Sequence, residues 1–261
     1  MTGSPSTVLR DHCERLRSLH RPGAPLLLPN VWDAATARAV VAAGYPAIAT
    51  TSAGVAAALG YDDHEGAPAE EMLAAAARVA RAVEVPVTVD AETGYGLKPA
   101  ELVAALRAAG VAGCNLEDTD HAAGRLRDPG GQADWLRAVR RAAAEDGYPL
   151  VINARVDVFL APYFAGAGPG SQQELLPEAV RRANAYLEAG ADCVFPIALW
   201  ETEALRGFLS AVHGPVNVVR LPRSPSLAEL AALGVARVSW AAALYRQAMA
   251  RFEEQLAAIR E

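Results

Sequence analysis

Lysine is nearly absent from this chain of 261 residues: Lys98 is the only one, and the other basic side chains are arginines and histidines. Schiff-base catalysis by a strand lysine, one way to run aldol chemistry, would depend on this residue alone. Lys98 follows a Gly-Tyr-Gly-Leu stretch, where a loop or the start of a helix is expected. We therefore interpret Lys98 as a surface residue rather than an imine former.

Cysteine is also scarce. Cys13, Cys114 and Cys193 have no metal-type spacing, and their odd number favours free thiols in a reducing cytosol. The first residues contain no apolar stretch of the kind found in signal peptides. The net charge of -6 gives no electrostatic reason to expect nucleic-acid or anionic-membrane binding. We expect a cytoplasmic protein with neither kind of partner.

Apolar residues, by contrast, are plentiful: 52% of the chain is hydrophobic, which is ample for a packed core. Short apolar runs alternate with alanine-rich helical stretches, several of which end at a glycine such as Gly44 or Gly110. Runs buried on both faces predict a parallel (β/α)8 TIM barrel. A doubly wound sheet is the alternative, but no GxGxxG follows the first strand. The predicted strands are 25–31, 46–53, 85–92, 112–118, 149–157, 192–198, 215–221 and 236–241.

We expect one barrel domain over residues 1–261, with 1–24 as an N-terminal helical extension and 242–261 as a terminal helix. The terminal helix is amphipathic, so it either covers the bottom of the barrel or packs on a neighbouring subunit. Two connections, 53–68 and 119–132, exceed ordinary loop length. Both follow strands on the C-terminal side, where barrel enzymes carry their chemistry.

The stretch VPVTVDAETGYG ends an apolar run with two acids one residue apart, Asp90 and Glu92. Side chains at i and i+2 of a strand share a face, so these like charges lie together, and such a site usually supplies a cation. The same parity groups Asn115 with Glu117, and Asn153 with Arg155. The alternative is that these acids pair with arginines or cap the following helices.

A carboxylate cluster with few histidines and no nearby thiolate favours a hard ion, Mg2+ with Mn2+ possible, over Zn2+. Arg155 would balance the charge and grip a substrate carboxylate or phosphonate. The backbone of Thr51, Ser52 and Ala53 is a candidate anion clamp. The set suits binding of a small dianionic acid and formation of an enolate, whose oxygen an ion stabilises.

These residues carry a resemblance. The chain resembles the isocitrate lyase and phosphoenolpyruvate mutase superfamily, in particular its short single-barrel bacterial branch, which includes methylisocitrate lyase. The resemblance implies a (β/α)8 barrel whose last helix is swapped between subunits of a homo-oligomer, a dimer or a dimer-of-dimers tetramer. It also implies Mg2+ at the C-terminal mouth and substrates that are 2-oxo or 2-hydroxy carboxylates or phosphonate analogues. The matching segments are LPNVWDAATARAVVAAGYPAIATTS, LGYDD, PVTVDAETGYG, AGCNLEDTDH, INARVDVF and GADCVFP.

Carried over by position, the resemblance makes Asp90 the direct metal ligand. Glu92, Glu117 and Asp63 would act largely through water, and Glu92 stands where an aspartate is commoner. Arg155 matches the arginine that grips the substrate. Thr51, Ser52 and Ala53 match the clamp on the substrate carboxylate.

The usual acid–base devices are missing. The lyases carry a lid with a Lys-Arg-Cys-Gly-His-type sequence, and the mutases a Lys-x-Asn-Ser lid; this chain has neither after its fourth strand. Cys114 cannot replace the lid cysteine, because it faces away from Glu117. His121 in this segment is the first candidate for proton transfer. Tyr95 is the second, although packing at the pocket wall is the more frequent role of such a tyrosine.

The substrate pocket is expected to have apolar walls. Ile197 occupies a position where the lyases carry a glutamate, which indicates an alkyl- or aryl-substituted acid. Asn153, which shares the face of Arg155, is assigned to substrate binding as well. The other expected wall residues are Trp32, Tyr61, Phe195 and Trp240.

The leading functional hypothesis is an Mg2+-dependent lyase that cleaves or forms a C–C bond next to a carboxylate through a metal-held enolate. The alternative is a 2-oxo acid or phosphonate hydrolase, or a phosphonomutase, of the same superfamily. A third reading, from a different class, is a catalytically silent protein that binds a small carboxylate.

Overall fold

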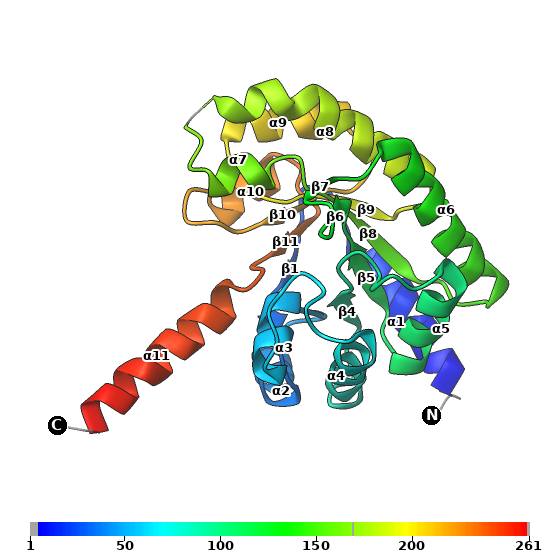
Figure 1. The fold of residues 1–261 in the computed structure, drawn as a ribbon, viewed down its shortest axis with the longest axis vertical. Coiled ribbons are helices and arrows are strands. Elements are labelled where there is room, and N and C mark those ends of the chain that lie inside the picture. Colours follow the sequence, from blue (N-terminus) through cyan, green and yellow to red (C-terminus); the bar gives the residue numbers. More distant parts are fainter. Residues whose placement is uncertain (1–4, 169, 260–261) are drawn as a thin grey trace.

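Eight parallel strand positions form a closed barrel surrounded by helices in the computed structural model, which describes residues 5–168 and 170–259 (Figure 1). One sheet has the order β2-β3-β4-β5-β8-β9 and another the order β1-β11-β10. Only Pro29 separates β1 from β2, and a bridge between Val194 and Val216 joins β9 to the start of β10. The barrel strands are β1 Leu26–Leu28 with β2 Asn30–Val31, β3 Ile48–Thr50, β4 Val87–Asp90, β5 Gly113–Leu116, β8 Val151–Val156, β9 Cys193–Pro196, β10 Asn217–Val219 and β11 Arg237–Ser239.

The predicted barrel is therefore confirmed, and the doubly wound alternative is wrong. Each of the eight predicted ranges contains a strand, and the observed strands are shorter by a few residues at their ends. All six residues of β8 are buried, as expected for a strand covered by side chains on one face and by helices on the other.

Helices cover the outside of the barrel in the order in which they follow the strands (Figure 1). α8 carries Pro177 inside the helix, where proline removes one backbone hydrogen bond of the helix. The helices after the N-terminal one are α2 Ala34–Ala42, α3 Ser52–Leu59, α4 Ala69–Arg81, α5 Pro99–Ala109, α6 Pro129–Glu145, α7 Leu160–Phe164, α8 Ser171–Glu188, α9 Thr202–Ala211, α10 Leu227–Ala232 and α11 Ala243–Ile259.

The N-terminal helix α1, Pro5–Ser18, closes the end of the barrel at which the strands begin. Leu16 is fully buried, and a Cβ added to Gly113 at the start of β5 would lie 2.9 Å from a methyl group of Leu16. Arg17 donates to the carbonyl oxygens of Pro149 and Leu150 just before β8. Residues 1–4 of the expected extension over 1–24 lie outside the described residues, as do residues 260–261 of the expected terminal helix.

Helix α11 leaves the barrel and projects away from it (Figure 1). No described residue of α11 is buried. The expectation that the terminal helix covers the bottom of the barrel is therefore wrong, because α1 already occupies that end. The swap of α11 between subunits stays a prediction.

Two elements of the fold were not predicted, a β-hairpin and the helix α7. A two-stranded antiparallel hairpin, β6 Thr119–Asp120 and β7 Arg125–Leu126, lies in the long connection after β5. The short helix α7 follows β8 directly. The three cysteines are buried and unpaired. Among the described residues no helix is both long and apolar enough to cross a membrane.

Asp192 connects α1, α6 and β8 near the end of the barrel at which the strands begin. Its Oδ1 accepts from Arg17 Nε of α1 at 2.7 Å, and its Oδ2 accepts from the Ile152 N–H of β8 at 2.8 Å and from Arg140 of α6. We predict that Asp192→Ala lowers the free energy of unfolding by about 2–3 kcal/mol, because two guanidinium groups and one N–H lose their partner. Urea unfolding measures the change.

The matched control is Asp134→Ala. Asp134 also pairs with an arginine, but its side chain is 78% exposed, so a change below about 0.5 kcal/mol is expected. Equal losses in the two variants would contradict the role of Asp192.

The buried His20, just after α1, should make the stability of the protein depend on pH. Its Nδ1 donates to the Leu16 carbonyl at 2.8 Å, and burial, with Arg237 nearby, lowers its pKa to about 4. The unfolded chain therefore binds more protons than the native state between pH 6.5 and 4, and stability is lost as the pH falls through this window. We expect His20→Gln to remove a slope of up to about 1.4 kcal/mol per pH unit, measured by urea unfolding at several pH values. Parallel pH profiles for the two proteins would contradict this assignment.

Candidate active site

A cavity of about 400 Å3 opens at the end of the barrel where the strands finish. Asp90 ends β4, Asn115 lies near the end of β5, and Arg155 near the end of β8, and all three line it. Of the predicted site residues, those that line the cavity are Thr51, Ser52, Ala53, Asp63, Asp90, Arg155 and Ile197, whereas Trp32, Glu92, Tyr95, Glu117, His121 and Asn153 do not.

Asp90 has one carboxylate oxygen without a partner. Its Oδ2 accepts from Ser52 Oγ at 3.0 Å, and its own N–H donates to Thr50 Oγ1 at 3.0 Å. Oδ1 is buried and makes no hydrogen bond within the described part of the chain. A buried, unpaired carboxylate oxygen is costly unless a ligand satisfies it. A cation is the ligand that fits its charge.

Glu92 is held by Glu65, a residue of the long connection 53–68 that the sequence did not mark as part of the site. The Glu65 N–H donates to Glu92 Oε1 at 2.6 Å. In return, Glu65 Oε1 accepts from the N–H groups of Thr93 and Tyr95, at 3.2 and 2.7 Å, and from Thr93 Oγ1 at 2.5 Å. The loop at residues 63–65 is therefore fastened to the turn after β4. No sequence signal identified Glu65, because its carboxylate bonds mostly to main-chain groups and its partners lie 27 to 30 residues away.

This pair of loops has an unusual backbone. His64, Glu65, Glu92 and Tyr95 all have positive φ angles, between 48° and 66°. Such conformations are unfavourable for residues other than glycine and concentrate at functional sites. The reciprocal bonds of Glu65 and Glu92 help to hold them.

Buried negative charge accumulates beside Asp90. Burial, with repulsion from Asp90, Asp63 and Glu117, raises the pKa of Glu92 to about 8. Burial also raises the pKa of Glu117 to about 7, although Arg155 and His121 act in the opposite direction. Acids that resist ionisation together are typical of sites that bind a cation.

Glu117 is not free in this structure. Its two oxygens bond to Arg155 and to His121 Nε2. Arg155 also donates through Nε and Nη2 to Asp157, at 2.7 and 2.9 Å. The alternative that acids pair with arginines thus holds for Glu117 and Asp157, but not for Asp90.

His121 lies at the turn of the β6–β7 hairpin, and its bond to Glu117 raises its pKa. The His64 ring, which lines the cavity, is 4.7 Å from the His121 ring. The two imidazoles are therefore neighbours, with His64 at the cavity and His121 bonded to Glu117. Cys114 is different, because burial raises the pKa of its thiol to about 12 and it supplies no thiolate.

Tyr95 is not arranged as a proton donor to the cavity. Its hydroxyl donates to the main-chain carbonyl of Asp90 at 3.3 Å, and burial raises its pKa well above the usual value. Its ring packs instead against the core and against the cluster of Val55 and Met72.

The first turn of α3 faces the cavity through Thr51, Ser52 and Ala53. The Thr51 N–H is already bonded to the Val31 carbonyl at 3.1 Å. The first N–H groups of a helix have no intrahelical partners, so those of Ser52 and Ala53 can bind an anion. The predicted anion clamp would therefore have two available N–H groups rather than three.

Asn153 does not line the cavity. Its predicted direct contact with the substrate is therefore corrected. Asn153 is fully buried, and its Nδ2 donates to Asn115 Oδ1 at 2.8 Å. Arg237 Nη2 donates to the same oxygen at 3.1 Å. Because Arg237 is only a donor, Asn115 must direct its oxygen downward, which leaves its Nδ2 donors for the cavity.

Three of the expected wall residues also lie elsewhere. Trp32 packs edge-to-face on Tyr245 of α11, with ring centroids 5.2 Å apart. Tyr61 donates to Glu71 at 2.7 Å, and Trp240 lines a separate groove beside α2. Phe195 and Ile197 do line the cavity. Arg246, from the first turns of α11, lines it as well and was not foreseen.

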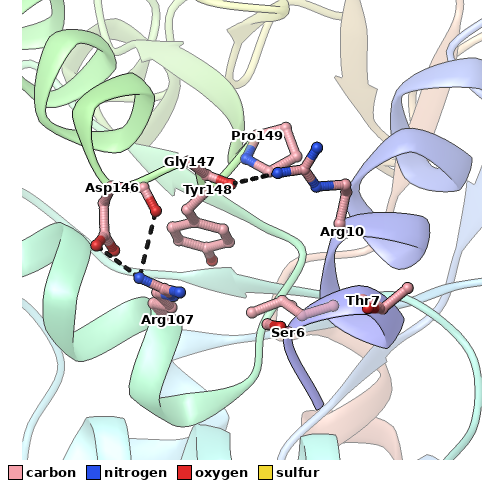
Figure 2. A pocket seen from close by; sticks show the side chains of 9 residues that line it. Ser6, Thr7, Arg10, Arg107, Asp146, Gly147, Tyr148 and Pro149 are labelled. Atoms are coloured by element: carbon pink, nitrogen blue, oxygen red, sulfur yellow. Dashed lines mark hydrogen bonds and ion pairs between the residues drawn. The ribbon is translucent and has the colours of Figure 1, made fainter. Parts of the chain in front are cut away.

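A second cavity, of about 440 Å3, lies near the opposite end of the barrel (Figure 2). Figure 2 shows Arg107 bonded to Asp146, and Arg10 donating to the Gly147 carbonyl. Its described polar side chains leave no buried atom without a partner. This cavity therefore lacks the unsatisfied charge found at Asp90.

The residues at the mouth fit a divalent ion that keeps water. Among the described residues, no three His, Cys, Asp or Glu side chains converge closely enough to hold an ion by themselves. Mg2+ often takes only one or two carboxylates and retains several waters, so Asp90 with more distant acids suits it. A structural Zn2+ site would need four closer ligands.

Comparison with known proteins gives consistent results. The family model for phosphoenolpyruvate phosphomutase matches residues 16–260. The 2-methylisocitrate lyase of Escherichia coli K12 is 30% identical over 229 residues, covering 80% of this chain and 73% of that protein. A crystal structure from Burkholderia cenocepacia J2315, described as a candidate phosphonomutase, is 42% identical, with a TM-score of 0.88 over 95% of this chain and 98% of that one. The structure of a 2,3-dimethylmalate lyase is 26% identical, with a TM-score of 0.81 over 99% and 85%.

Glu65 provides a test of the loop arrangement. We predict that Glu65→Ala releases the 63–65 loop, because three hydrogen bonds to residues 93–95 are lost. Hydrogen exchange of the Thr93 and Tyr95 amides should accelerate by about 10-fold or more, corresponding to about 1.4 kcal/mol or more of local stability. Glu145→Ala on the exposed end of α6 serves as control, and unchanged exchange in Glu65→Ala would contradict the arrangement.

Proposed function

Because the chain belongs to the phosphoenolpyruvate phosphomutase family, within the isocitrate lyase/phosphoenolpyruvate mutase superfamily, we propose that it is an Mg2+-dependent carbon–carbon lyase. Its substrate would be a small 2-hydroxy or 2-oxo mono- or dicarboxylic acid. Enzymes of this superfamily are lyases and mutases of small carboxylates or phosphonates and generally use a divalent metal. The observation that carries the proposal is the buried Oδ1 of Asp90, a residue that lines the cavity, which has no hydrogen-bond partner among the described residues.

The ion, Mg2+ or alternatively Mn2+, would stabilise the enolate oxygen that develops when the bond breaks. Asp90 would hold it directly. Glu92, Glu117 and Asp63 would act through water, which is consistent with their position around Asp90 rather than on a common point.

The carboxylate of the substrate would lie at the first turn of α3. The free N–H groups of Ser52 and Ala53 and the guanidinium of Arg155 face the same cavity. Arg155 is held by Asp157 in a two-point contact, so its remaining donors keep a fixed direction. A substrate that binds there would compete with Glu117 for Arg155.

His121 would move the proton. It bonds to Glu117, and it lies on a hairpin rather than in the barrel wall, so a shift of the hairpin brings it toward the cavity. The bond to Glu117 raises its pKa and therefore favours the protonated form, which suits an acid that protonates an enolate.

A second candidate function is a phosphonate or 2-oxo acid reaction of the same superfamily. The relative from Burkholderia cenocepacia J2315 described as a candidate phosphonomutase supports it. The hairpin at residues 119–126 contains no cysteine, and hydrolysis by water needs less acid–base machinery than C–C cleavage. Product analysis separates the two: a lyase gives two carbon fragments with no gain of water, whereas a hydrolase incorporates one oxygen from labelled water.

We propose further that α11 is exchanged between subunits of a homo-oligomer. Its apolar side chains lie at positions 249, 252, 256 and 259, and Phe252 and Ile259 are 52% and 79% exposed. A groove of about 410 Å3, lined by Val40, Tyr45, Trp240 and other apolar residues, lies beside the root of α11. A helix from a second copy would cover this groove and bury its own apolar side.

The metal site is tested by Asp90→Asn. For the wild-type protein we expect Mg2+ at about 100-fold its dissociation constant to raise the melting temperature by roughly 5–10 °C, because a ligand of the native state stabilises it. Asp90→Asn should abolish the shift in differential scanning fluorimetry, while the surface variant Asp134→Asn retains it. A full shift in Asp90→Asn would refute the metal site.

The exchanged helix is tested by Phe252→Glu combined with Leu256→Glu. Two charges on the apolar side should convert the oligomer to monomers, with a loss of association of at least 100-fold, because each would have to be desolvated in the interface. Light scattering after size-exclusion chromatography measures the mass. Glu253→Lys, on another side of the helix, should leave it unchanged, and a monomeric wild-type protein would contradict the exchange.

A further inference from the structure

The strand order divides the cavity into two halves. Strands β2, β3, β4 and β5 are neighbours. These strands and the first residue of α3 supply the polar lining residues Asn30, Ser52, Asp90 and Asn115. Strands β8 and β9 are also neighbours, and a bridge links β9 to the start of β10. Strand β9 and the segments that follow β8, β9 and β10 supply a different set of lining residues: Leu160, Tyr163, Phe164, Phe195, Ile197 and Leu221.

In the half of the cavity formed by β8, β9, β10 and the segments after them, Arg155 of β8 is the one charged lining residue among the described residues. The other charged residues that line the cavity are Asp63, Asp90 and Arg246, which belong to other segments. The cavity is therefore amphipathic, with one end for a charged group and the other for an apolar one. Its volume of about 400 Å3 falls in the range of pockets for drug-sized ligands and exceeds the needs of a two- or three-carbon acid.

Helix α7 forms part of the wall of the apolar half. It has only five residues, and Val158 and Phe159 anchor the chain before it in the core. Phe164 nevertheless lines the cavity with 78% of its surface exposed, and its ring packs on Tyr163 with centroids 5.6 Å apart. A large exposed aromatic ring at the edge of a cavity gains free energy when a ligand covers it.

We propose that this half of the cavity is a subsite for the alkyl or aryl side group of the substrate acid. The inference rests on the proposed function, because it takes the acid group of the ligand to lie at Asp90 and the α3 N-terminus. The side group would extend from there across the barrel mouth to Ile197 and Phe164. It deepens the proposal by assigning the substrate class as a 2-oxo or 2-hydroxy acid with an apolar substituent of several carbons.

The test uses binding of 2-oxo acids to the full-length protein with Mg2+, measured by isothermal titration calorimetry. The probes are pyruvate, 2-oxobutyrate and 2-oxopentanoate, with oxalate as a ligand that occupies only the polar half. Each added methylene should lower the dissociation constant about fourfold, which is the effect of burying one CH2 group. Phenylpyruvate extends the series to an aryl group.

Two variants locate the effect. Ile197→Gln introduces an uncharged polar side chain into the apolar half, and Phe164→Ala removes its exposed ring without disturbing the core. Both should flatten the series while leaving the dissociation constant of oxalate within twofold, which also shows that the variants are folded. Leu227→Ala, which shortens an exposed apolar side chain on α10 that does not line the cavity, is the control and should keep the full gradient.

The outcomes separate the two proposals. A flat series in the wild-type protein with oxalate binding intact overturns the subsite alone. A gradient that persists in both variants overturns it as well, because the side group then lies elsewhere. Failure of oxalate to bind in the presence of Mg2+ overturns the proposed function, and this inference with it.

Discussion

Repulsion between buried carboxylates at the mouth of an apolar barrel is the constraint around which the site is built. Asp90 keeps one oxygen unpaired, and burial raises the pKa values of Glu92 and Glu117. The protein compensates part of this charge with Arg155 and His121, both of which bond to Glu117. The part that is left uncompensated lies at Asp90. In energetic terms the site is unfavourable as it stands, and such sites are where ligands gain most from binding.

The lower layers of the barrel support this arrangement through polar groups as well as apolar ones. Arg237 is 1% exposed and pairs with no carboxylate of residues 5–168 and 170–259, and burial lowers its pKa to about 10. Its bond to Asn115, shared with Asn153, fixes the direction of the amide that forms the floor of the cavity. A buried guanidinium beneath the mouth also contributes positive potential to the same end of the barrel, where anionic substrates would bind.

Much of the barrel could be predicted from the sequence, because side-chain parity in a strand is a local property. The eight apolar runs gave the eight strands, and the spacing of Asp90 and Asn115 placed both at the cavity. Parity does not tell how deep in the barrel a side chain lies. Asn153 was therefore assigned to the cavity although it lies one layer below Arg155. Glu65 bonds to main-chain groups, which no residue pattern reveals. Trp32 was misplaced because its partner, Tyr245, lies more than 200 residues away.

The root of α11 has a consequence for how the protein behaves at low concentration. Arg246 lines the cavity and Tyr245 packs on Trp32, while the rest of the same helix has no buried residue to hold it. One wall of the cavity thus belongs to a helix that the subunit alone cannot anchor along its length. If another copy covers the far end of the helix, this wall would be rigid. In an isolated subunit, the wall would move together with the helix. Dilution would then alter the shape of the pocket, and specific activity would depend on enzyme concentration even where every subunit remains folded.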